Sequence, residues 1–113
     1  MEQLNRIQLR GIVGNIRVSD ISGKKVARIS VATNYAYKTQ DGCAVIETTW
    51  HNIVAWEKPE NPALDSIQRG DAIYIEGRIR QQRYTDSAGS EHTVTEVIAS
   101  KLELVTEPLT MEC

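Results

Sequence analysis

Apolar and polar residues alternate along most of this sequence, in stretches separated by residues typical of turns. Successive side chains of a β-strand point to opposite faces, so this alternation indicates strands with one buried face. The pattern predicts strands over residues 5–16, 26–38, 45–56, 72–84 and 92–105. In the fourth of these, Ile73, Ile75, Gly77 and Ile79 are expected to face the core. Asp41-Gly42 is a signal for a hairpin between the second and third of them. Strands spaced in this way are typical of an all-β barrel or sandwich.

One segment, between the third and fourth expected strands, breaks the alternation. Pro62 suits the first turn of a helix and Asn61 is the expected N-cap. We expect a helix of about two turns from Pro62 to Arg69, ended by Gly70. A five-stranded barrel with one short helix in this position is the OB-fold arrangement, which is therefore the expected fold.

Length and composition are those of one soluble domain. The chain has 113 residues, of which 41% are hydrophobic and 25% are charged, enough for one small core. We expect a single domain over residues 1–105 and a frayed end over residues 106–113. No apolar run approaches the ~20 residues of a membrane span, and the first residues lack the apolar region of a signal peptide. A cytoplasmic protein with no membrane partner is therefore expected.

The residues give no sign of catalysis or of a cofactor. Cys43 and Cys113 have the spacing of neither a disulfide framework nor a zinc site. Motifs for a serine nucleophile, a phosphate-binding loop and a zinc protease are all missing from the sequence. His51 and His92 have no Cys or carboxylate at ligand spacing, so each is interpreted as a structural or interface residue. We therefore expect no enzyme, no metal and no cofactor.

The stretch from Thr48 to Trp56 contains both tryptophans of the chain. In a straight strand Trp50, Asn52, Val54 and Trp56 share one face, whereas a bulge would change that parity. Two large aromatic side chains on one strand face are either part of the core or a platform for a flat ligand. The residue pattern of this stretch alone leaves both possibilities open.

Binding of single-stranded nucleic acid requires aromatic faces for the bases and basic side chains for the phosphates. The chain contains no Phe, and Ile, Val and Leu at the alternating positions suffice for a core, so several aromatic side chains are left to be explained. Those with basic neighbours are Tyr37, Trp50, Trp56 and Tyr84. Tyr74 lies between Ile73 and Ile75 and is interpreted as a packing residue, while the residues favour neither role for Tyr35. The net charge of -2 averages over all faces, and binding depends on the local patch.

The sequence resembles the bacterial single-stranded DNA-binding proteins of the SSB type from about Asn5 to Val105. The segments that carry the resemblance are residues 31–34 (VATN), 47–51 (ETTWH), 73–78 (IYIEGR), 84–89 (YTDSAG) and 95–97 (TEV). The resemblance implies an OB-fold that binds single-stranded DNA with little sequence preference, in the bacterial cytoplasm with the nucleoid. It also implies that the protein protects such DNA during replication, recombination or repair.

The resemblance also implies positions for the nucleic-acid site. Four aromatic positions on which the family stacks bases correspond to Tyr37, Trp50, Trp56 and Tyr84. Family-like phosphate contacts correspond to Arg6, Lys58, Arg80 and Arg83, and the strand pattern adds Arg10, Lys38 and Arg78. Asn52 stands where some members carry a basic residue, so one contact of the family is expected to be missing.

Members of the family usually form homotetramers, with the first strand and the region of His51 near the subunit contacts. The resemblance therefore implies a homo-oligomer, a tetramer in the first place or a dimer. Typical replicative members continue into a linker and an acidic tip that ends in Pro-Phe, whereas this sequence ends Glu107-Pro108-Leu109-Thr110-Met111-Glu112-Cys113. Partners recruited through such a tail are therefore not expected.

Three other functions remain open at this stage. A primosome-type OB protein would bind single strands and partner proteins, but retention of all four aromatic positions argues against it. A protein-binding OB module would bury Trp50 and Trp56 at a protein interface. A nuclease on an OB scaffold would need converging carboxylates and a metal ion, which the sequence does not indicate.

Overall fold

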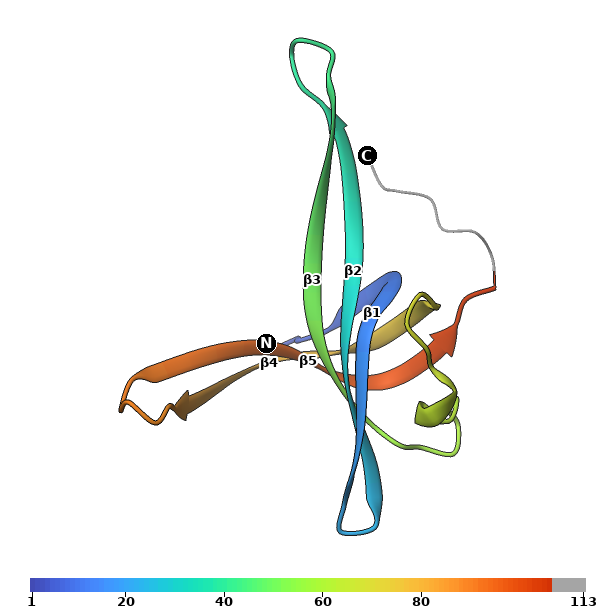
Figure 1. The fold of residues 1–113 in the computed structure, drawn as a ribbon, viewed down its shortest axis with the longest axis vertical. Coiled ribbons are helices and arrows are strands. Elements are labelled where there is room, and N and C mark those ends of the chain that lie inside the picture. Colours follow the sequence, from blue (N-terminus) through green and yellow to red (C-terminus); the bar gives the residue numbers. More distant parts are fainter. Residues whose placement is uncertain (107–113) are drawn as a thin grey trace.

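A computed structural model describes residues 1–106, which form a closed five-stranded barrel (Figure 1). The elements are β1 (Ile7–Ile21), β2 (Lys24–Lys38), β3 (Ala44–Trp56), the 3-10 helix η1 (Leu64–Ser66), β4 (Ala72–Thr85) and β5 (Glu91–Leu104). The order around the barrel is β1-β2-β3-β5-β4, and β4 pairs back to β1. Every pair is antiparallel except β3 with β5. The prediction of a five-stranded all-β OB-type barrel is confirmed, while most of the predicted frayed end lies outside the described residues.

The first strand is longer than predicted and serves two neighbours. Its first half, from Ile7 to Ile12, pairs with β4, and the remainder pairs with β2. Gly14 is the extra residue of a bulge at this change of partner, because the register passes from Val13 directly to Asn15. A bulge bends its strand and increases the local twist, which allows one strand to close the barrel on both sides.

The turn after β1 is tighter than the predicted turn region of residues 20–25. Ser22 and Gly23 alone connect the paired residues Ile21 and Lys24, and both have positive φ angles, 54° and 81°. A two-residue loop with two positive φ angles matches the twist of the strands that it joins. The Asp20 carboxylate accepts a hydrogen bond from the Gly23 N–H at 3.0 Å and holds the turn.

The core fills the inside of the barrel, and the connection after β3 closes one end of it. Leu64 and Ile67 of this connection are only 1% and 3% exposed. Fully burying one such side chain contributes roughly 1.5–3 kcal/mol. The strands supply the rest of the core, which is formed by Val13, Ala27, Ile29, Val31, Ile53, Ala55, Ile73, Ile75, Val97, Ala99 and Leu102.

The predicted helix of about two turns is wrong in length, because only Leu64–Ser66 is helical. Asn61 is not its N-cap. Instead its side-chain oxygen accepts a hydrogen bond from the N–H of Leu102 at 3.2 Å and ties the connection to β5. Packing of two apolar side chains against the barrel end, rather than helix propensity, fixes this segment.

Two hairpins extend beyond the barrel as long arms (Figure 1). The β2–β3 arm has no buried residue between Val31 and Ile53, and the β4–β5 arm has none between Ile75 and Glu96. The prediction that Ile79 belongs to the core is wrong, since its side chain is 42% exposed. The reason is that β4 leaves its partner β1 after Gly77, so that the inward side of the strand faces no core.

No helix in the described part of the chain has the length and apolar character needed to cross a membrane.

Candidate nucleic-acid interface

The outer face of β3 carries both tryptophans. Ile53 and Ala55 point into the barrel, and β2 pairs with β3 without a register shift. The prediction that Trp50, Asn52, Val54 and Trp56 share one face is therefore confirmed. Trp50 is 59% exposed and Trp56 is 39% exposed, so neither indole belongs to the core. Val54, between them, is buried.

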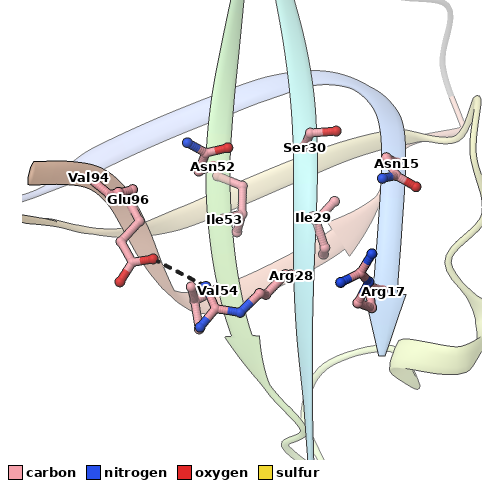
Figure 2. A pocket seen from close by; sticks show the side chains of 10 residues that line it. All are labelled: Asn15, Arg17, Arg28, Ile29, Ser30, Asn52, Ile53, Val54, Val94 and Glu96. Atoms are coloured by element: carbon pink, nitrogen blue, oxygen red, sulfur yellow. Dashed lines mark ion pairs between the residues drawn. The ribbon is translucent and has the colours of Figure 1, made fainter. Parts of the chain in front are cut away.

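A groove runs across this outer face, over the part of β3 between the two tryptophans. Figure 2 shows the side chains that line it. We call it the outer groove. Asn15 of β1 pairs with Ser30 of β2, which pairs with Asn52 of β3, so three polar side chains form a row across three strands. The outer groove is lined by Asn15, Arg17, Arg28, Ile29, Ser30, Asn52, Ile53, Val54, Val94 and Glu96. A row of polar side chains with arginines beside it suits a hydrated, charged polymer better than an apolar ligand.

Glu96 lies at the edge of the outer groove between two arginines. Arg80 donates from Nε to Oε1 at 3.2 Å and also from Nη2 to the same oxygen. Arg28 Nη1 lies 3.6 Å from the other oxygen, Oε2 (Figure 2). Arg80, which the sequence predicted as a phosphate contact, is therefore already paired with a carboxylate.

Trp56 has lysines as neighbours at the end of β3. Lys24, Lys58 and Trp56 line one pocket, together with the acidic Glu57. Lys25 also lines it but is paired with Asp65 in the connection that closes the barrel. A base stacked on Trp56 would therefore have two cationic side chains within the same pocket for its phosphates.

The predicted phosphate contacts Arg6, Lys58 and Arg78 line a second groove, beside the middle of β4. Glu76 lies in this second groove and accepts hydrogen bonds from Arg6 and Gln8, each at 3.1 Å. Hydrogen bonds from Tyr74, Gln8 and Arg6 lower the pKa of Glu76 to about 2. The carboxylate is thus held in its charged form, and the local charge of this groove is less positive than its three cations alone would make it.

Tyr84 lies at the end of β4 in the second arm and is 50% exposed. Its ring stacks on His92 of β5, with ring centroids 5.2 Å apart. The imidazole is fixed in turn by a 2.6 Å hydrogen bond to Asp86, and this bond lowers the pKa of Asp86. One side of the Tyr84 ring is therefore covered by His92, and the ring is held in place at its position in the arm.

Tyr37 lies in the β2–β3 arm, on the other face from Trp50. Trp50 pairs with Ala32, and Tyr37 follows Ala32 at an odd spacing in a strand without bulges, which places the two rings on opposite faces. Tyr35 shares the face of Tyr37, with ring centroids 6.1 Å apart. Lys38 is exposed beside them.

The remaining predicted contacts lie away from the outer groove. Arg10 is on β1 with its guanidinium 5.6 Å from the centre of the Tyr74 ring. Arg83 pairs with Thr93 and is exposed on the face opposite Tyr84. His51 is half-buried and hydrogen-bonded to Thr33 at 2.8 Å, and burial lowers its pKa.

The structure therefore divides the eleven predicted residues into several groups. Trp50, Trp56, Tyr84 and Arg80 share the outer face, Arg6, Lys58 and Arg78 share the second groove, and Tyr37 with Lys38, Arg10 and Arg83 lie elsewhere. Within residues 1–106 no three His, Cys, Asp or Glu side chains are grouped as metal ligands would be.

Sequence reasoning missed Arg17, Lys24 and Arg28. Arg28 had a usable signal, because it stands between the buried residues Ala27 and Ile29 and must face outward. Nothing in the sequence indicated that Arg28 pairs with Glu96, because this ion pair joins β2 to β5, which are distant in the sequence and not adjacent in the barrel.

Comparison with known proteins agrees with the fold. A single-stranded DNA-binding protein of Chlorobaculum tepidum is 30% identical over 105 residues, which are 90% of this chain, and the match spans 65% of that protein's length. The structure titled as a Plasmodium falciparum SSB complex with ssDNA superimposes with a TM-score of 0.79 at 26% identity, covering 93% of this chain and 97% of that one. A small single-stranded DNA-binding protein of Streptomyces coelicolor shares the fold, with a TM-score of 0.70 at 18% identity over 94% of this chain and 97% of that one.

The sequence profile described as the single-strand binding protein family matches residues 4–105, nearly the whole described chain. The barrel fold agrees with that match. The chain belongs to the single-strand binding protein family.

Proposed function

We propose that this protein binds single-stranded DNA with little sequence preference, on the outer face of the barrel and along its two arms. The observation that carries the proposal is the exposure of Trp50 and Trp56 on one strand face, beside grooves that contain arginine and lysine. The family supports the choice of ligand.

Base stacking supplies the sequence tolerance, since every base has a π-face. Each stacked base contributes roughly 1–3 kcal/mol as judged by substitution. The four proposed stacking positions are Tyr37, Trp50, Trp56 and Tyr84, and each is about half-exposed. Phosphates would contact the cations of the outer groove and the second groove, with release of counterions.

Cationic side chains form the second component of the proposed interface. Besides Arg80, they are Arg6, Arg10, Lys38, Lys58, Arg78 and Arg83, to which the structure adds Arg17, Lys24 and Arg28. The net charge of the chain is -2, so binding depends on these local groups and weakens as salt rises.

A homotetramer is proposed as the binding form, with a dimer as the alternative. The support is the family and the face that contains the first half of β1 and His51. His51 is half-buried and close to neutral in charge at neutral pH because burial lowers its pKa, which suits a residue that becomes buried between subunits. Sedimentation equilibrium tests this state, and a monomer at the concentrations used for binding would contradict it.

A fluorescence titration tests the binding proposal. Trp50→Phe and Trp56→Phe each leave one tryptophan as a reporter, and oligo-dT is added to each variant at low and at high salt. We expect saturable quenching of both reporters that weakens at high salt. No quenching of either reporter at low salt, with the protein folded, would contradict stacking and favour a protein-binding OB module.

Affinity measurements complete the test. Trp56→Ala should weaken binding of a labelled oligo-dT by roughly 5- to 100-fold, the equivalent of one stack. Tyr74→Phe is the comparison and should weaken binding less than Trp56→Ala, because the Tyr74 hydroxyl, which accepts a hydrogen bond from Gln8 at 2.9 Å, takes no part in the proposed stacking.

A further inference from the structure

Glu96 is the one side chain within residues 1–106 that is both charged and buried, with 3% of its surface exposed. A buried carboxylate is costly unless it is paired. Each of its oxygens faces a different guanidinium, Arg80 at Oε1 and Arg28 at Oε2. The arrangement is therefore an arginine–glutamate–arginine triad at the edge of the outer groove. Figure 2 shows the Arg28–Glu96 pair of this triad.

The two arginines reach Glu96 from different sides. Arg80 is its direct pairing partner on β4, whereas Arg28 extends from β2 across Val54 of β3. Their side chains keep 41% and 68% of their surface exposed. Both guanidiniums thus spend only part of their five N–H donors on Glu96, and the other donors are open to solvent.

Glu96 is held in place by the sheet. The neighbouring residue Val97 pairs with Ile53 of β3 on one side and with Ile79 of β4 on the other. The carboxylate therefore stays below the two arginines when a ligand arrives, and it cancels one of their two positive charges.

We propose that Arg28 and Arg80 form a phosphate subsite of the outer groove, and that Glu96 is the positioning residue that sets its strength. This rests on the proposed binding of single-stranded DNA. Guanidinium groups bind phosphate through paired N–H donors, and the two exposed groups lie against opposite oxygens of the same carboxylate. The triad has a net charge of one, so a phosphate bound there releases fewer counterions than at two unpaired arginines.

The test is the salt dependence of oligo-dT affinity, measured by anisotropy of a labelled oligonucleotide in a series of NaCl concentrations. Arg28→Gln should make the slope of log K against log[NaCl] shallower by about 0.7, the value of one phosphate contact on a single strand. Glu96→Gln should make it steeper by up to about 0.7 and raise affinity severalfold at low salt. Arg69→Gln and Glu103→Gln are the matched charge controls outside the grooves, and both should leave slope and affinity unchanged.

Arg28→Lys separates phosphate geometry from charge. Lysine keeps the charge but lacks the planar fork, so affinity should fall while the slope stays at the wild-type value. A purely structural role for the triad predicts instead that thermal stability falls in Glu96→Gln and that neither Arg28 variant changes binding.

Failure of the phosphate subsite can be distinguished from failure of the proposed DNA binding. A wild-type protein that binds no oligo-dT overturns the function itself. Wild-type binding with an unchanged slope in Arg28→Gln overturns the subsite, and so does weaker binding by folded Glu96→Gln with an unchanged slope. If Glu96→Gln does not fold, the two Arg28 variants decide, with unchanged binding by both as the contradicting result.

Discussion

The indole of Trp50 lies directly over Gly14, the extra residue of the β1 bulge. A methyl group added at Gly14 would come within 2.3 Å of Cζ3 and 2.6 Å of Cη2 of the Trp50 ring. Such separations are far inside van der Waals contact, so any side chain at this position must move the indole. The bulge in β1 therefore sets the position of an aromatic ring on β3.

Gly14→Ala should weaken binding of oligo-dT by displacing Trp50. The expected loss is up to that of one stack, ~1–3 kcal/mol, measured by anisotropy of a labelled oligonucleotide. In a Trp50→Ala background the added methyl group has space, so Gly14→Ala should cause no further loss of affinity. Equal losses in the two backgrounds would show that residue 14 acts on binding by another route.

Tyr37 and Trp50 lie on opposite faces of the β2–β3 arm, so one DNA strand must pass around the arm to contact both. Tyr37→Ala should therefore weaken binding of long oligo-dT, of ~16 nucleotides or more, and have little effect on the shortest oligonucleotides that bind, of ~4 nucleotides. Anisotropy titrations over a length series measure this. The prediction fails if Tyr37→Ala reduces affinity equally at every length.

Glu76 predicts an acid-sensitive contribution to stability. Its pKa is about 2 in the folded protein against an ordinary value of 4.5, so the folded state favours the carboxylate. The resulting stabilisation is complete above pH 4.5 and is lost as the pH falls towards about 2. The difference in melting temperature between wild type and Glu76→Gln should therefore shrink over this range, because a protonated Glu76 is as uncharged as Gln.

Thermal unfolding followed by circular dichroism, at neutral pH and at several pH values below 4.5, measures this difference. Glu103→Gln is the control, because Glu103 pairs only with Lys101 on the surface at 3.2 Å. If the difference in melting temperature between wild type and Glu76→Gln stays constant with pH, the proposed stabilisation by the Glu76 carboxylate is contradicted.

Alternation was a sufficient guide wherever a strand has the core on one side and no bulge. It correctly placed Ile73 and Ile75 inside, since both lie in a regular part of the barrel, and it correctly put Trp50 and Trp56 on one face without deciding whether that face is buried. It failed for Ile79, because the pattern does not show where a strand loses its neighbour. Where the barrel ends is decided by which strands pair with one another, and these strands are distant in the sequence.

The site was predictable in its residue types more than in its geometry. Aromatic side chains beside cations in the sequence indicated a nucleic-acid ligand. The contacts of Arg28 with Glu96 and of Tyr84 with His92 are seen only in the structure. Such contacts depend on which strands become neighbours and on the twist of the sheet. The length of η1 was missed for a similar reason, since two apolar side chains against the barrel end decide it.

The lack of buried residues in the two arms has a consequence for how this protein can change over evolution. All core side chains lie in the barrel, whereas Tyr37, Trp50 and Tyr84 lie between Val31 and Ile53 or between Ile75 and Glu96. Substitutions in the arms can therefore retune affinity without an equal loss of foldability. Selection for affinity can thus act on arm positions that contribute nothing to the core.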